Sequence, residues 1–376
     1  MQPWNEDVRG APALELINSD ATTIRVEAGP GTGKTFGLIR RVQRILHPDG
    51  LNVSGKDVLI VAFNRVIANH LRAGVEHLLS DSPHNGSPNI RTVHALCLQV
   101  IGGPLRLLLP HEREAMLYDV LHLFPAIRDE FQRHADLNQA LRDHEAGLRE
   151  HLAVWQAVNR WLTRHKANLI SDLPRLLLDK IHAGDYEGAA YEHVIVDEFQ
   201  DLTGAEQLLF SKLRSPGGSF VALGDSKQSI YRFRGNDREG LAKLQDLDPA
   251  ADIADMPSLE CQRCPVPIVA AANHLMSLYP PPMTCTSEAP ANLHVLYWRT
   301  PQAEARGLAT HVIENVRAHA NDRHLVMVTR RRFGYWLRDA MKKMDVDVAV
   351  DCQRRSGLHT FADEDCTLPA ASRTVA

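Results

Sequence analysis

Residues 23–35 constrain the fold more than any other part of the chain. Residues 23–27 are typical of a short strand, residues 28–35 read Ala-Gly-Pro-Gly-Thr-Gly-Lys-Thr, and residues 36–46 are compatible with a helix. A strand that leads through such a loop into a helix predicts a phosphate site, because backbone N–H groups and the positive helix end converge on the anion. The alternative is an ordinary glycine-rich turn.

The side chains of this loop suit a nucleotide. Lys34 offers a mobile ammonium to the phosphates, and the Thr35 hydroxyl can reach Mg²⁺. Ala28 stands where the usual motif has its first glycine, which the loop tolerates because later residues supply the cradle. The predicted nucleotide-binding residues are Ala28, Gly29, Pro30, Gly31, Thr32, Gly33, Lys34 and Thr35.

A second constraint is the apolar run at residues 194–196, which ends in the adjacent carboxylates Asp197 and Glu198. A buried strand would fix the backbone so that Asp197 takes a hydrated Mg²⁺ while Glu198 polarises an attacking water. An exposed acidic turn is the alternative, and the pair alone does not decide between them. The phosphate loop upstream favours the chemical interpretation.

Two further apolar runs, residues 58–63 and 220–225, are typical of parallel strands that helices cover on both faces. With the strand at 194–196 they predict an α/β fold with a P-loop parallel sheet. Residues 102–185 are rich in Leu, Ala, Arg, Glu and His with interspersed prolines, which predicts a helical insertion.

A second α/β unit is expected after the three prolines at 280–282. Residues 293–297 and 324–329 look like strands, and residues 302–318 look like a helix between them. Residues 351–376 are polar without an apolar period, so we expect a frayed tail.

Composition limits the class of protein. The chain has 376 residues, 44% hydrophobic and 23% charged, with a formal net charge of -4. It has neither an apolar run of about 20 residues nor a signal peptide, so we expect a cytoplasmic protein without a membrane partner. The net charge confines any nucleic-acid contact to a local groove.

Cys261 and Cys264 have no second pair at metal-site spacing.

Residues 224–235 leave a buried strand and place Gln228 close to where a γ-phosphate would lie. A glutamine amide can donate to that phosphate and accept from the attacking water. Tyr231 and Phe233 alternate with arginines, a pattern that can stack bases and meet phosphates. Core packing is the alternative for both rings; it is slightly favoured for Tyr231, whereas base stacking is favoured for Phe233.

The chain resembles the ATP-binding, N-terminal part of UvrD/Rep/PcrA-like superfamily 1 DNA helicases over nearly its whole length. Residues 28–35 match the family's first motif, residues 194–201 its DEFQD-type second, and residues 224–235 its GDxKQSIYxFRGA-type third. Residues 62–68 and 91–97 are weaker matches, to the segment carrying single-strand contacts and to the TxHxxC segment that follows it.

Residues 259–265 resemble the fourth motif, usually LxxNYRS. The match puts Arg263 at the arginine that approaches the γ-phosphate, where a positive side chain stabilises charge that develops in transfer. A surface salt bridge is the alternative role for Arg263.

The resemblance implies a 3′ to 5′ translocase and helicase on single-stranded DNA or a duplex/single-strand junction, driven by two RecA-like domains around ATP and Mg²⁺. The implied catalytic residues are Lys34, Glu198, Gln228 and Arg263. The implied metal-binding residues are Thr35 and Asp197. The implied DNA-binding residues are Asn64, Arg65, His94, Tyr231 and Phe233.

The resemblance also implies how the chain divides into domains. Residues 1–103 and 186–288 would form RecA-like domain 1A, residues 104–185 the inserted helical subdomain 1B, and residues 289–376 the start of domain 2A with its polar tail. The fifth and sixth motifs of the family are missing. We therefore expect a truncated or N-terminal form that a partner or longer chain completes, with a nucleotide- and single-strand-binding module that does not unwind as the alternative.

One further departure concerns the nucleobase. Val8 stands where the family has a glutamine that reads adenine, so purine selectivity cannot be carried over from the resemblance.

Overall fold

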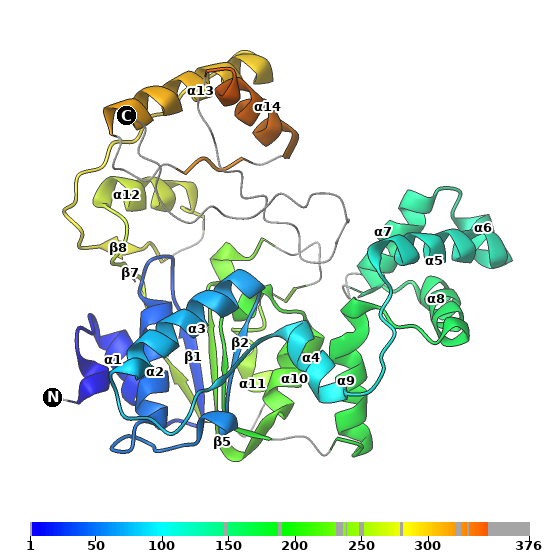
Figure 1. Ribbon diagram of the computed structural model, residues 1–376, viewed down its shortest axis with the longest axis horizontal. Helices are drawn as coiled ribbons and strands as arrows, with labels where there is room; N and C mark the ends of the chain where they lie inside the picture. Colours follow the sequence, from blue (N-terminus) through cyan, green and yellow to red (C-terminus); the bar gives the residue numbers. More distant parts are fainter. Residues whose placement is uncertain are drawn as a thin grey trace. The chain divides into compact units, whose positions relative to one another are not determined.

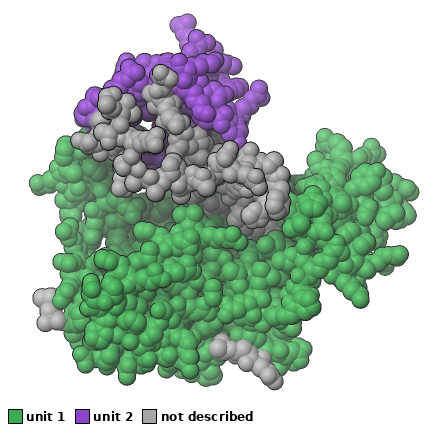
Figure 2. Space-filling model, in the orientation of Figure 1, with its two compact units in different colours: residues 1–291 green, residues 292–376 purple. Residues whose placement is uncertain are grey.

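The computed structural model describes residues 2–145, 149–186, 190–230, 236–237, 239–247, 252–278, 281–319, 325–328 and 331–344. The chain divides into two compact units, residues 1–291 and residues 292–376 (Figure 2). None of the helices in these ranges is both long enough and apolar enough to cross a lipid bilayer.

The larger unit is built on a parallel sheet (Figure 1), which has six strands in the described residues, in the order β3-β2-β4-β5-β1-β6. The strands are β1 (Thr23–Glu27), β2 (Val58–Ala62), β3 (Asn89–Thr92), β4 (Tyr191–Val196), β5 (Arg214–Gly224) and β6 (Ile253–Asp255). The strands expected at 23–27, 58–63, 194–196 and 220–225 are confirmed, and β4 and β5 begin earlier than expected.

Helices cover both faces of this sheet, which explains the continuous apolar runs. Along β2, Val58, Ile60 and Ala62 enter one core, whereas Leu59 and Val61 enter the other. The first core includes α1 (Ala11–Asn18), α2 (Lys34–Leu46) and α3 (Arg65–Ser80). The second includes α4 (Val93–Ile101), α9 (Leu173–Ala183), α10 (Gly204–Lys212) and α11 (Leu244–Leu247).

The helices of the insertion lie together in a group (Figure 1), and their apolar side chains form a separate core. It contains α5 (Pro110–Leu123), α6 (Pro125–Glu130), α7 (His134–Glu145) and α8 (Leu152–His165). The indole of Trp161 packs against this core and donates a 2.9 Å hydrogen bond to Asp119. Helix α9 lies within residues 104–185 but packs against α4 and α10 over the sheet. The core of the insertion therefore ends before α9.

Short elements connect these layers. Single 3-10 turns lie at Pro3–Asn5, Gly55–Asp57, Ile170–Asp172, Phe199–Asp201 and Ser226–Gln228. After the sheet come β7 (Glu260–Cys261), α12 (Val266–Leu275) and β8 (Thr284–Cys285), and β7 pairs with β8 in parallel.

The smaller unit contains α13 (Pro301–Ala318) and α14 (Arg331–Lys342), which pack through a small apolar cluster. The helix expected at 302–318 is confirmed. The strand expected at 293–297 is absent, and the described residues 325–328 of the other expected strand are not in a strand either. Strands need a partner for their backbone N–H and C=O groups, and neither segment has one among the described residues of this unit. The tail expected at 351–376 lies outside the described residues.

Arginines of α2 hold the N-terminal segment beside the phosphate loop. The buried guanidinium of Arg41 donates to the carbonyls of Leu16 (2.6 Å) and Ser19 (2.9 Å) at the end of α1. A cation is favoured there because the helix C-terminus carries partial negative charge.

Burial, followed by the charges of Arg41 and Arg44, lowers the pKa of His193 on β4 to about 4.

We expect His193 to make the protein sensitive to acid. The folded state keeps His193 neutral while the unfolded chain takes up a proton below pH 6.5, so stability falls from pH 6.5 to about pH 4. His193→Gln should remove on the order of 3 kcal/mol of this loss. Urea unfolding across that range measures the difference, and the exposed His182 in a His182→Gln variant is the control. Parallel curves for wild type and His193→Gln would contradict the assignment.

Candidate active site

The candidate residues follow the carboxyl ends of five adjacent strands, which meet at one edge of the parallel sheet. The loop of residues 28–33 follows β1, Asp197 follows β4, and Asp225 follows β5. Asn64 and His94 follow β2 and β3 on the other side of β4. The strand order therefore places the phosphate loop and the acidic turns next to each other.

The phosphate loop has the backbone that its glycines predict. Gly31 and Gly33 have φ values of 73° and 89°, in the left-handed region that other residues avoid. Lys34 is the first residue of α2, and its Nζ donates to the carbonyl of Ala28 (2.6 Å). The Thr32 hydroxyl donates to the carbonyl of Gly29 (2.9 Å). The Lys34 ammonium thus lies over the loop at which it is expected to bind phosphate.

The acidic pair is held tightly at the end of β4. The Asp197 N–H donates to the carbonyl of Val61 on β2 (3.0 Å), and its carboxyl group is buried. Burial, followed by the neighbouring Glu198, raises the pKa of Asp197 to about 7, although Lys34 acts to lower it. Glu198 has a φ of 53°, a strained conformation whose cost is on the order of 1 kcal/mol.

Gln200 connects the acidic pair to the next strand, a role that reasoning from the sequence missed. Its Nε2 donates to Glu198 Oε2 (2.7 Å), and its Oε1 accepts from the backbone N–H of Asp225 (2.9 Å). The side chain is buried, and a Cβ on Gly224 would lie 2.4 Å from Gln200 Oε1. The DEFQD run contains this glutamine, so the motif itself was the available signal.

The turn after β5 continues this network. Asp225 is buried and accepts hydrogen bonds from Gln228 Nε2 (2.7 Å) and from the backbone N–H of Lys227 (3.0 Å). A chain of contacts therefore runs from Glu198 through Gln200 and Asp225 to the exposed Gln228. Tyr231 and Phe233, expected to stack bases, lie outside the described residues.

The segment that carries Arg263 packs against the phosphate loop. The backbone N–H of Gln262 donates to the carbonyl of Gly31 (2.8 Å), and the N–H of Gly29 donates to that of Ser258 (3.0 Å). A Cβ on Gly31 would lie 2.9 Å from the Cβ of Arg263. The structure thus brings Arg263, which is exposed, beside the loop.

A small cavity of about 270 Å³ lies at the end of the phosphate loop. Gln262 reaches it from one side, and its Nε2 donates to the carbonyl of Arg9 (3.1 Å). The lining residues are Asp7, Arg9, Ala13, Thr32, Gly33, Phe36 and Gln262. Only Val8 was considered from the sequence, so the contribution of Gln262 was missed.

Three of the candidate DNA residues, Asn64, Arg65 and His94, follow β2 and β3, on the opposite side of β4 from the phosphate loop. Strands β2 and β3 pair at Ala62 and Thr92, which brings the starts of α3 and α4 together. Asn64 caps α3, because its Oδ1 accepts from the N–H of Ile67 (2.9 Å). Arg65 is exposed in the first turn of α3, and His94 is half-buried in the first turn of α4.

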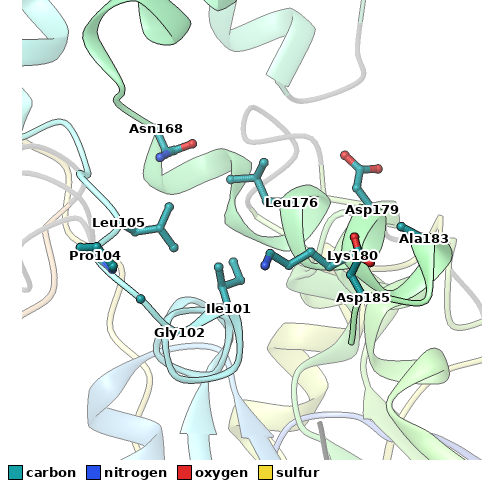
Figure 3. Close-up of a pocket in the computed structure, with 11 residues that line it drawn as sticks. Ile101, Gly102, Pro104, Leu105, Asn168, Leu176, Asp179, Lys180, Ala183 and Asp185 are labelled. Carbon is teal, nitrogen blue, oxygen red and sulfur yellow. The ribbon is translucent and has the colours of Figure 1, made fainter. Parts of the chain in front are cut away.

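A larger cavity, of about 510 Å³, lies between the end of α4 and α9, at the root of the insertion (Figure 3). Ile101, Leu105 and Leu176 supply its apolar wall, and Lys180 and Asp185 its charged rim. None of its lining residues belongs to the candidate site.

The parallel sheet and the phosphate loop define the chain as a P-loop, RecA-like α/β protein. A family model described as an AAA domain matches residues 13–234, and the chain belongs to that family. The chain is similar to ATP-dependent DNA helicase PcrA of Staphylococcus epidermidis (strain ATCC 35984), with 24% identity over 273 residues. It is also similar to the protein of that name from Staphylococcus aureus (strain Mu50), with 23% identity over 274 residues.

Both alignments cover 63% of this chain and 36% of the relative, so the matched part spans about a third of those proteins. The resemblance to the N-terminal part of UvrD/PcrA-like superfamily 1 helicases is confirmed at this level.

We expect Gly31→Ala to damage the site more than strain alone would. The new Cβ would lie 2.8 Å from Cys261 Sγ, in addition to the cost of a positive φ. Gly184→Ala is the matched control, because Gly184 has a φ of 76° and open space around it. Denaturant unfolding should show a loss of about 1 kcal/mol for the control and about 2 kcal/mol more for Gly31→Ala. Equal losses would contradict the packing of the two segments.

Proposed function

We propose that this chain is the ATP-hydrolysing part of a DNA translocase and helicase that moves 3′ to 5′ on single-stranded DNA. The observation that carries the proposal is the chain of hydrogen bonds from Glu198 through Gln200 and Asp225 to Gln228, next to a phosphate loop. Such a chain can connect events at a nucleotide with the segment that follows Gln228. The relatives named as ATP-dependent DNA helicases support this proposal.

The loop and its neighbours fit a nucleoside triphosphate with Mg²⁺. Lys34 would pair with the phosphates, and Thr35 and Asp197 would hold the metal ion. A buried carboxyl group with a pKa of about 7, beside a second carboxylate, fits a cation, which would favour its charged form. When bound, Mg²⁺ would neutralise part of the charge on the phosphate oxygens.

Glu198 would act as the general base toward water. Its strained backbone and the hydrogen bond from Gln200 fix the direction of its carboxylate. Gln228 would contact the γ-phosphate, and Arg263 would stabilise negative charge that develops during transfer.

The surface at the starts of α3 and α4 would follow the DNA strand. Arg65 would contact backbone phosphates, with Asn64 and His94 beside it, and Tyr231 and Phe233 would stack on bases. Binding would be indifferent to sequence and would fall steeply with salt.

The proposed division into parts follows the same scheme. Residues 1–103 and 186–288 would form domain 1A, residues 104–185 subdomain 1B, and residues 289–376 the beginning of domain 2A. A partner protein or a longer chain would supply the remaining motifs, including an arginine across the cleft.

The cavity beside Gly33 would receive the nucleobase. The Arg9 carbonyl only accepts hydrogen bonds, so the Gln262 amide turns its Nε2 toward it. The Oε1 of Gln262 accepts no hydrogen bond from the described residues, and it lies 3.9 Å from where a Cβ on Gly33 would be. An acceptor favours the amino group of adenine over the carbonyl of guanine. Gln262 would thus take the role of the glutamine that the family has at the position of Val8.

Turnover of ATP tests the proposed function. The wild-type chain should hydrolyse ATP faster when single-stranded DNA is added. Glu198→Gln should lower the rate by about 10² or more while it keeps nucleotide binding, because only the base is lost. Lys34→Ala should lose both ATP turnover and nucleotide binding, because the contact with the phosphates is lost as well. Nucleotide binding without stimulated turnover would instead favour a binding module that does not unwind.

Base selectivity tests the role of Gln262. Gln262→Leu should reduce the preference for ATP over GTP by about tenfold, because the acceptor is removed. Gln139→Leu, at an exposed position on α7, is the control. Competition of ATP and of GTP with a fluorescent ATP analogue measures this preference in both variants. An unchanged preference in Gln262→Leu would refute the assignment, whereas no binding by wild type would refute the nucleotide site itself.

A further inference from the structure

Three free cysteines gather in the segment that packs on the phosphate loop. Cys261 ends β7 and Cys285 ends β8, and the two are register partners in this parallel pair. Cys264 lies three residues after Cys261, just before α12. Cys261 is 1% exposed, whereas Cys264 and Cys285 are partly exposed.

Cys261 and Cys264 face each other across a tight turn. The backbone N–H of Cys264 donates to Cys261 Sγ (3.4 Å). The Cys285 thiol is engaged differently, because it donates to the carbonyl of Cys264 (2.9 Å). Two residues between cysteines in a turn are enough for a disulfide. The geometry therefore favours Cys261 and Cys264 as the pair.

This turn holds the phosphate loop in place. Cys261 Sγ and the Cβ of Arg263 both lie within 3 Å of where a Cβ on Gly31 would be, at 2.8 and 2.9 Å. The N–H of Gln262 is bonded to the carbonyl of Gly31 (2.8 Å). A displacement of the Cys261 sulfur toward Cys264 would therefore change the packing of Gly31 and the backbone that carries Gln262 and Arg263.

Over the part of the chain that the structure describes, no group of three or more His, Cys, Asp or Glu side chains has an arrangement that could hold a metal ion.

We propose that Cys261 and Cys264 form a thiol-oxidation site that controls the phosphate loop. Cys264, the more exposed of the two, attacks a small-molecule disulfide such as glutathione disulfide and releases one glutathione thiol. Cys261 then attacks the mixed disulfide and releases the second. Two protein thiols lose two protons and two electrons, and glutathione disulfide is reduced to two glutathione molecules. The loss of nucleotide binding that follows rests on the proposed function.

The test uses the 376-residue chain in which Cys352 and Cys366, outside the described residues, are replaced by serine. Burial raises the pKa of the Cys264 thiol, so the exchange with glutathione disulfide is run at mildly alkaline pH, where more thiolate is present. Peptide mapping by mass spectrometry should find a Cys261–Cys264 bond. Affinity for a fluorescent ATP analogue should fall at least about tenfold and return with dithiothreitol.

Two single variants make the test specific. Cys264→Ser should lose the bond and keep its affinity after oxidant treatment, whereas Cys285→Ser should behave like the parent chain. A bond that instead joins Cys285 to either partner, or a Cys261–Cys264 bond that leaves affinity unchanged, would overturn the proposal. If the reduced chain binds no nucleotide, the proposed function fails, and the peptide map still decides whether the oxidation site exists.

Discussion

The buried amide of Gln200 is the interaction on which the site depends. It joins the ends of β4 and β5, because one end of the amide donates to Glu198 and the other accepts from the backbone of Asp225. Two hydrogen bonds of this kind contribute about 1 kcal/mol each, more where one partner is charged. Without these hydrogen bonds, nothing from Gln200 would fix the carboxylate of Glu198, whose backbone is strained. Gly224 leaves the space that this amide occupies.

The local parts of the fold could be predicted from the sequence, since each carries its own signal. Apolar runs covered on both faces predicted β2, β4 and β5, and the glycine pattern predicted the loop before Lys34. The strand expected at 293–297 was wrong, because an apolar run does not reveal whether a partner strand exists. The Gln262 contact with Arg9 joins residues 253 positions apart, a separation that no local pattern reports.

The electrostatics of the acidic pair support the proposed cation site. Asp197 is buried beside Glu198, and burial together with that second carboxylate disfavours its charged form. Lys34 opposes this effect but does not cancel it, since the pKa of Asp197 remains raised. The sheet holds this pair on one side and Gln200 holds it on the other, an arrangement that fits the proposed catalytic role.

We propose that Glu198 and Gln228 act together through Gln200 and Asp225. A double-mutant cycle between Gln200→Ala and Gln228→Ala, read out as ATP turnover with single-stranded DNA, tests it most directly. We predict a coupling energy on the order of 1 kcal/mol or more, because either substitution breaks the same chain of contacts. Additive effects of the two substitutions, within about 0.3 kcal/mol, would show that Glu198 and Gln228 are not coupled through these contacts.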